Sequence, residues 1–275
     1  MEAARRSSGG MVIVTRDAPS IQAVEEGEEG MNTDVMTKRM EEASPRLVAR
    51  TIGVFYAMTM VTGLFAQAFV SDRLVVSGDA AATAASILTH RSLYELGFTA
   101  FMVEMACQIV MTALFYRLLK PVNRSVALAG LCLGLAGGII KTFSRVFYLA
   151  PLFVLGGAHY LSVFNPEQLQ ALALLFLKVN DRGAGIALAF FGFENLLQGY
   201  LIYRCTFLPR IFGVLGAIAG LGWMTFLSPT LGYRMFLYVA VYALLLSVAL
   251  IVWLLVFGVD EQRWKEQARA AETRA

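Results

Sequence analysis

The chain has 275 residues, of which 57% are hydrophobic and only 16% are charged, and its mean hydropathy is +0.63. Soluble domains carry about 25% charged residues, so this composition excludes a water-soluble enzyme fold and predicts that lipid surrounds most of the chain. The net charge of +3 is small, and its basic residues lie between apolar runs, which favours a membrane over nucleic acid as the partner. The three cysteines have no CxxC spacing, so we expect neither a disulfide framework nor a zinc site.

Residues 1–45 differ in composition from the rest of the chain. They hold an acidic run at residues 25–29, and their one apolar stretch, at residues 11–14, is shorter than the roughly 7–15 residues of a signal peptide core. This composition predicts a disordered cytoplasmic tail. Three methionines in the segment are alternative starts of the chain: Met31, Met36 and Met40.

Six apolar runs follow, each long enough to approach the roughly 20 residues that a membrane-spanning helix needs. The runs are continuous rather than alternating, which predicts helices and not a β-barrel. The expected spans are Thr51–Val70, Leu96–Tyr116, Val126–Tyr148, Ala184–Tyr203, Ile211–Leu227 and Phe236–Phe257.

Lysine and arginine in the connections predict the orientation. With the N-terminus inside, the inner segments carry thirteen of these residues near the spans and the outer segments carry five. An excess of basic residues marks cytoplasmic loops, so we expect both termini on the cytoplasmic side of the membrane. The expected division is a tail at residues 1–45, a six-span membrane domain at residues 46–258 and a cytoplasmic C-terminal tail at residues 259–275.

Two outer segments are too long to be simple turns. Asp79 is a suitable cap for a run of helix formers at residues 80–92, and Asn165, Pro166 and Gln168 together form the start signal of a second helix that reaches residue 179. The expected fold class is therefore an all-α integral membrane protein, with six transmembrane helices and two short outer-leaflet helices.

Four ionisable residues interrupt the apolar spans: Glu104, Glu194, Lys141 and Arg145. Each costs roughly 2.5–3.5 kcal/mol at the centre of a spanning helix, so such residues are kept for function or are paired with one another. The two acids lie near mid-depth in the second and fourth spans, and the two bases lie in the outer half of the third.

The spacing of these residues predicts a polar centre between the helices. Gln108 lies four residues after Glu104, Gln198 lies four after Glu194, and Arg145 lies four after Lys141, so each span carries a polar stripe on one face. We expect the stripes to meet in a centre open to the outside that binds a small molecule or an ion. A proton relay through either glutamate is a narrower version of this hypothesis, and the alternative is an ion-pair network that only orients the bundle.

The residues provide little evidence for metal binding, catalysis or phosphate binding. His90 and His159 are the only histidines, and no third ligand has metal-binding spacing. No catalytic triad or phosphate-binding loop is recognisable. We therefore expect no catalytic residue, no metal and no cofactor, and the residues do not predict an oligomeric state.

Several stretches carry a resemblance to a known family. They are Leu74–Phe98, Leu119–Gly130, Tyr160–Leu177 and Gly199–Trp223. In these stretches the sequence resembles a bacterial multi-pass membrane family, domain of unknown function 4386, and the resemblance covers about residues 46–257. It implies a bacterial inner-membrane protein and supplies no activity.

Three functions remain open from the sequence. The charges within the spans favour a small transporter or ligand-binding membrane protein. The polar tail and the basic inner loops favour a membrane-anchored regulator or sensor that binds a cytoplasmic partner. A lipid-modifying membrane enzyme is the third alternative, although no nucleophile for it is recognisable.

Overall fold

The computed structural model describes residues 44–273. Residues 1–43 and 274–275 lie outside the described part, and so do the predictions of a disordered tail and of alternative starts. Residues 44–273 are helical nearly throughout and form no strand.

Six helices are long and apolar enough to cross a membrane, which confirms the predicted all-α, six-span fold. The first span consists of α2 (Pro45–Leu64), a π-helical segment (Phe65–Ser71) and α3 (Asp72–Leu74). The others are α5 (Arg91–Leu119), α6 (Arg124–Val154), α7 (Pro166–Arg204), α8 (Arg210–Met224, with a 3-10 turn to Leu227) and α9 (Pro229–Val256).

Three of these helices, α2, α6 and α7, begin at polar caps that lie before the apolar runs. The side chain of Ser44 accepts the backbone N–H of Leu47 at the start of α2. The side chain of Asn123 accepts the backbone N–H of Val126 at the start of α6. Such caps satisfy backbone donors that a helix leaves free at its N-terminus.

Of the two expected outer helices, one is a separate element and the other is part of a spanning helix. The first is α4 (Ala80–Thr89), capped by Asp79 as predicted. The capping box of Asn165 and Gln168 is also present, but the helix that it begins does not end near residue 179. It continues without a break as α7, so the second outer helix is not a separate element.

The polar stretch at residues 180–185 continues as a helix because its side chains have partners inside the bundle. Asn180 is 2% exposed and receives a hydrogen bond from Arg145 of α6. Gly183 and Gly185 lie against neighbouring side chains, with no room for a Cβ at Gly183. Sequence reasoning took this polar stretch for a break between two helices.

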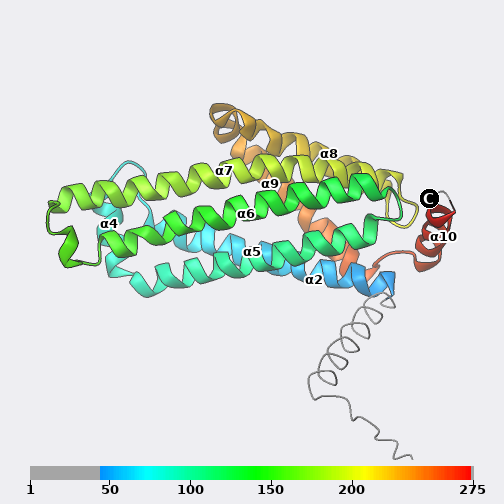
Figure 1. The fold of residues 1–275 in the computed structure, drawn as a ribbon, viewed down its shortest axis with the longest axis horizontal. Coiled ribbons are helices and arrows are strands. Elements are labelled where there is room, and N and C mark those ends of the chain that lie inside the picture. Colours follow the sequence, from blue (N-terminus) through cyan, green and yellow to red (C-terminus); the bar gives the residue numbers. More distant parts are fainter. Residues whose placement is uncertain (1–43, 274–275) are drawn as a thin grey trace, which may run out of the picture. The chain divides into compact units, whose positions relative to one another are not determined.

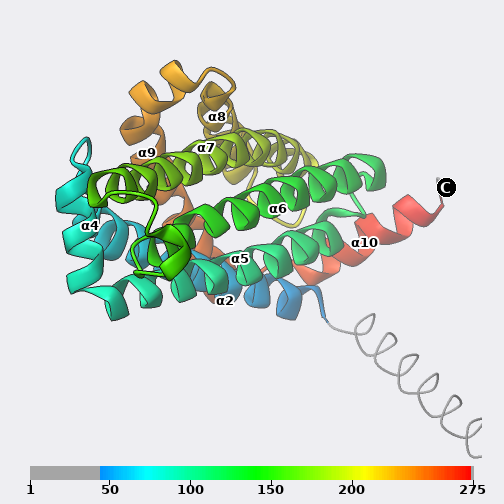
Figure 2. The same ribbon diagram turned by 60° about the vertical axis from the view of Figure 1, so that its left-hand side comes forward.

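The six spans form a closed ring. Consecutive spans pack against one another along the chain from α5 to α9, and α2 contacts both α5 and α9. Figure 1 shows α5, α6 and α7 running side by side, and Figure 2 shows α8 and α9 beyond α7. The helix α4 packs against α7 at one end of the ring, and the C-terminal helix lies at the other end.

Aromatic packing fills the ring at the end that carries α4. The Tyr94 ring of α5 stacks on the Tyr148 ring of α6 with centroids 4.5 Å apart, and the Tyr94 hydroxyl donates to the backbone carbonyl of Tyr148. Phe101 meets the same Tyr148 ring edge-on. These side chains belong to the buried apolar cluster of the domain.

The helices α7 and α8 approach each other closely at two glycine pairs. A Cβ at Gly199 would lie 2.7 Å from the Gly213 carbonyl oxygen, and a Cβ at Gly220 would lie 2.7 Å from the Gly192 carbonyl oxygen. Small residues are typical of close helix contacts in membranes.

The expected C-terminal tail forms a helix in its described part. Asp260 caps α10 (Glu261–Glu272), whose Trp264 indole donates to the Leu118 carbonyl oxygen at 2.9 Å. The Thr206 backbone N–H and hydroxyl both donate to the side chain of Gln267, each at 3.1 Å. α10 is therefore attached to the end of the ring opposite α4.

Candidate functional site

A cavity of about 190 Å³ lies at the centre of the ring, and all six spans contribute to its wall. Most of its lining is apolar. Seven polar side chains also line it: Tyr56, Gln108, Lys141, Glu194, Asn195, Gln198 and Ser247.

Glu194 is the acidic side chain that lines the cavity. It is 3% exposed, and its Oε1 accepts hydrogen bonds from Thr112 Oγ1 at 3.1 Å and from Gln198 Nε2 at 2.8 Å. The carboxylate lies against the backbone of Gly134 in α6, since a Cβ there would lie 2.6 Å from Oε2. Neutral donors and a glycine surface therefore fix the position of this carboxylate.

Glu104 is held differently, by a cation. Lys141 Nζ of α6 lies 2.6 Å from Glu104 Oε1 of α5, and both side chains are largely buried. Like Glu194, Glu104 lies against a glycine of another span, because a Cβ at Gly63 would be 2.9 Å from its Oε1. Hydrogen-bonded ion pairs of this kind offset part of the cost of burying two charges.

The two acids are therefore not equivalent. Within residues 44–273, the Lys141–Glu104 contact is the only ion pair between two spans, and no Lys, Arg or His nitrogen lies within 4.0 Å of the Glu194 carboxylate. The charges of Glu104 and Lys141 compensate each other. By contrast, no cationic side chain of the described residues lies close enough to balance the charge of an ionised Glu194.

Arg145 lies apart from the cavity, toward the end that carries α4. Its Nη1 donates to Asn180 Oδ1 at 3.1 Å, and its Cζ lies 3.5 Å from the centroid of the Phe101 ring. This side chain is 3% exposed. An amide oxygen and an aromatic face thus take the place of the carboxylate that the sequence led us to expect.

The cavity occupies the half of the ring that ends at α10. Glu194 lies ten residues before the end of α7 at Arg204, which is about 15 Å at 1.5 Å per residue. The Lys141–Glu104 pair lies near the middle of its two helices. The sequence placed Arg145 in the same polar centre as Lys141, and the structure separates the two because Arg145 turns into the aromatic packing instead.

The structure brings together four of the six expected site residues around one cavity, namely Gln108, Lys141, Glu194 and Gln198. Glu104 borders the cavity through its contact with Lys141, and Arg145 does not line it. Sequence reasoning missed Thr112, Asn195 and Ser247 as members of the site. Thr112 lies four residues after Gln108, so the i, i+4 spacing could have found it; no such pattern marks Ser247.

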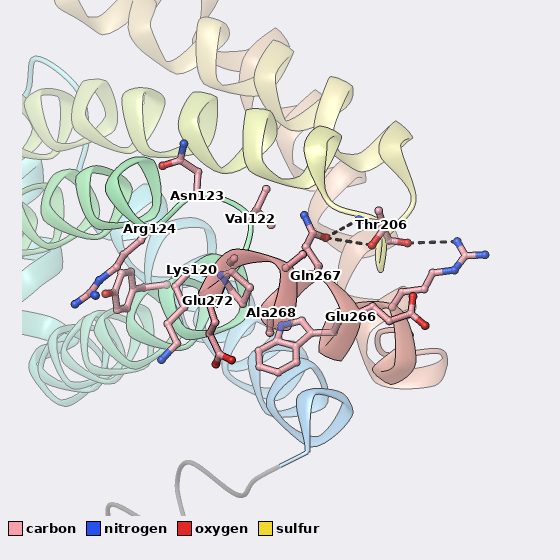
Figure 3. A pocket seen from close by; sticks show the side chains of 15 residues that line it. Lys120, Val122, Asn123, Arg124, Thr206, Glu266, Gln267, Ala268 and Glu272 are labelled. Atoms are coloured by element: carbon pink, nitrogen blue, oxygen red, sulfur yellow. Dashed lines mark hydrogen bonds between the residues drawn. The ribbon is translucent and has the colours of Figure 1, made fainter. Parts of the chain in front are cut away.

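A second, larger hollow of about 1270 Å³ lies between α10 and the turn from α5 to α6. Figure 3 shows Lys120 and Arg124 on the side of that turn, Glu266 and Glu272 on α10, and the Thr206–Gln267 contact that closes one side. The hollow is a surface groove with charges of both signs. The described residues contain no cluster of three or more His, Cys, Asp or Glu side chains that could hold a metal ion.

The fold and the cavity define a multi-pass α-helical membrane protein with a cavity between its spans that is lined by apolar and polar side chains. The chain belongs to the family described as Domain of unknown function (DUF4386), whose model matches residues 51–258. Neither the curated proteins nor the solved structures contain a match to the chain.

Proposed function

We propose that this protein binds a small polar solute or ion in the central cavity and carries it across the membrane. The observation that supports this most is the buried Glu194 carboxylate, which faces a cavity inside the bundle without a protein cation beside it. A purely structural acid at this depth would be expected to have an ion-pair partner, as Glu104 has in Lys141.

The orientation is part of the proposal. The ends of the spans next to α10 include Arg117, Lys120, Arg124 and Arg204, and this excess of basic residues favours the cytoplasmic side of a bacterial inner membrane. In that orientation the cavity lies in the cytoplasmic half of the bilayer. The aromatic packing around Tyr148 then separates it from the outer face.

Accessibility of single cysteines tests whether water reaches the cavity. We start from a chain in which the three native cysteines, Cys107, Cys132 and Cys205, are replaced by alanine. In this background, Ser247→Cys places a thiol on the cavity wall. Val252→Cys, on the same helix α9 and 51% exposed on the outer surface of the ring, is the matched control. A membrane-impermeant methanethiosulfonate reagent is then added to intact cells and to inside-out vesicles.

The proposal predicts that Ser247→Cys reacts and that Val252→Cys does not. Reaction from both sides supports transport, and reaction from one side alone supports binding without transport. If Ser247→Cys reacts from neither side while the protein remains folded, the cavity is closed to water and the proposal fails.

The groove beside α10 favours a second candidate function, a regulator or sensor that binds a cytoplasmic partner there. Its support is the size of the groove and the charges of both signs along it. Trp264→Ala removes the indole that attaches α10 and should abolish such a function without changing access to Ser247→Cys. Unchanged function in Trp264→Ala cells would remove this candidate.

A further inference from the structure

The charge balance around the cavity indicates the sign of the ligand. Two charged side chains line it, Lys141 and Glu194. The Lys141 ammonium already contacts Glu104 at 2.6 Å, whereas Glu194 receives hydrogen bonds from the neutral groups of Thr112 and Gln198. A buried, unpaired charge is costly in a low-dielectric interior, so a ligand that carries a positive charge gains most in this cavity.

An anionic ligand finds no comparable partner. Binding at Lys141 would compete with the Glu104 carboxylate, and Glu194 would repel the anion. Arg145 is outside the cavity and is held by Asn180 and the Phe101 ring. The arrangement therefore disfavours phosphate, carboxylate and sulfate groups.

The apolar part of the wall favours an organic cation over a bare metal ion. Five aromatic side chains line the cavity, drawn from four of the six spans: Tyr56, Phe115, Phe191, Phe212 and Trp223. Aromatic faces attract ammonium groups by about 0.5–2 kcal/mol each, and they offer no oxygen ligands to Na⁺ or Mg²⁺.

The size of the cavity limits the ligand further. A volume of about 190 Å³ is smaller than the roughly 300–1,000 Å³ of pockets for drug-sized ligands. An ion with only a few non-hydrogen atoms fits this space. The polar groups of Asn195 and Ser247 lie on the same wall and can bind a hydroxyl group.

We infer that the ligand is a small organic ammonium ion, whose positive charge lies beside Glu194 and whose alkyl groups contact the aromatic wall. This inference rests on the proposed function, since it names the class of solute that the cavity takes. It assigns Glu194 as the counter-ion of the ligand, Trp223 and Phe191 as its aromatic contacts, and the Glu104–Lys141 pair as the neutral border of the site.

Thermal unfolding of the purified full chain in detergent tests the inference. The probes are choline, tetramethylammonium, NaCl and dimethylbutanol, in which carbon replaces the quaternary nitrogen of choline. We expect choline and tetramethylammonium to raise the melting temperature by about 5–10 °C near 100-fold saturation. NaCl at equal ionic strength and dimethylbutanol are expected to have little effect.

Three variants connect the effect to the site. Glu194→Gln should lose the response to choline, and Glu167→Gln, the same change at an exposed position of the same helix, should keep it. Trp223→Leu leaves Glu194 in place and should weaken choline binding by about 5–30-fold. It serves as the second test if Glu194→Gln does not fold.

The outcomes separate this inference from the proposed function. An equal response to dimethylbutanol and choline, or a response to NaCl alone, refutes an organic cation as the ligand. If Ser247→Cys still reacts with the reagent, the proposed function of the cavity stands. An undiminished choline response in both Glu194→Gln and Trp223→Leu overturns the site. Failure of every probe together with an unreactive Ser247→Cys refutes the inference and the proposed function.

Discussion

Gly134→Ala is the sharpest test of how Glu194 is held. Gly134 lies on α6 where the Glu194 carboxylate contacts the backbone, and an added Cβ would lie 2.6 Å from Oε2 and closer still to Oε1. Gly138, one turn later on the same helix, is the matched control. A Cβ there would lie 3.8 Å from Ile109, an ordinary contact distance.

The expected magnitudes follow from these distances. Replacing glycine by alanine inside a helix gains about 1 kcal/mol, and this gain is the whole effect expected at Gly138. At Gly134 the methyl group forces the carboxylate away from Thr112 and Gln198. Overpacking costs about 1–3 kcal/mol, and losing both hydrogen bonds to a charged group costs about 3–6 kcal/mol. Less the gain of about 1 kcal/mol, we expect Gly134→Ala to destabilise the protein by about 3–8 kcal/mol net.

Reversible unfolding in SDS, followed by tryptophan fluorescence, measures these free energies. A double-mutant cycle with Glu194→Ala identifies the cause, because the methyl group at position 134 meets no carboxylate once that side chain is shortened. Gly134→Ala should then be neutral or stabilising in the Glu194→Ala background. An equal destabilisation in both backgrounds would refute the contact between Gly134 and Glu194.

The remaining predictions concern the ion pair, the C-terminal helix and a buried thiol. Lys141→Met leaves Glu104 buried without its cation and should lower the free energy of unfolding by about 3–5 kcal/mol. The double variant Lys141→Met with Glu104→Gln should recover much of that loss. SDS unfolding measures both variants, and additive losses would contradict the pairing. Trp264→Phe removes the hydrogen bond to Leu118 and should expose α10 to trypsin faster than wild type, whereas an unchanged cleavage rate means that this bond does not attach α10. Burial raises the pKa of the Cys205 thiol, so maleimide labelling of Cys205 should stay slow at pH 7.5 and increase only above the ordinary thiol pKa; rapid labelling at pH 7.5 would contradict its burial.

The spans and four of the residues that line the cavity were predictable because both follow from spacing on a helix. Continuous apolar runs indicated six helices, and the i, i+4 pairs placed Gln108 and Gln198 on the faces of Glu104 and Glu194 that turn inward. The caps at Asp79 and Asn165 were also predictable, since they depend on residues only three positions apart.

What the sequence could not predict depends on contacts between distant helices. Nothing local to Arg145 indicates that Asn180 and Phe101 surround it rather than an acid. Likewise, Lys141 could have paired with either glutamate, and only the packing of α5 on α6 selects Glu104. For this reason Arg145 was predicted to lie in the polar centre, whereas the structure places it outside the cavity.

A cryo-EM structure in a lipid nanodisc, determined with millimolar choline, shows directly whether Glu194 binds an organic cation. We expect Glu194 to face the cavity, no cation of the chain to lie within about 4 Å of its carboxylate, and non-protein density to fill the space between it and Trp223. A structure in which Lys141 or Arg145 pairs with Glu194, or in which protein side chains fill the cavity, would contradict this expectation.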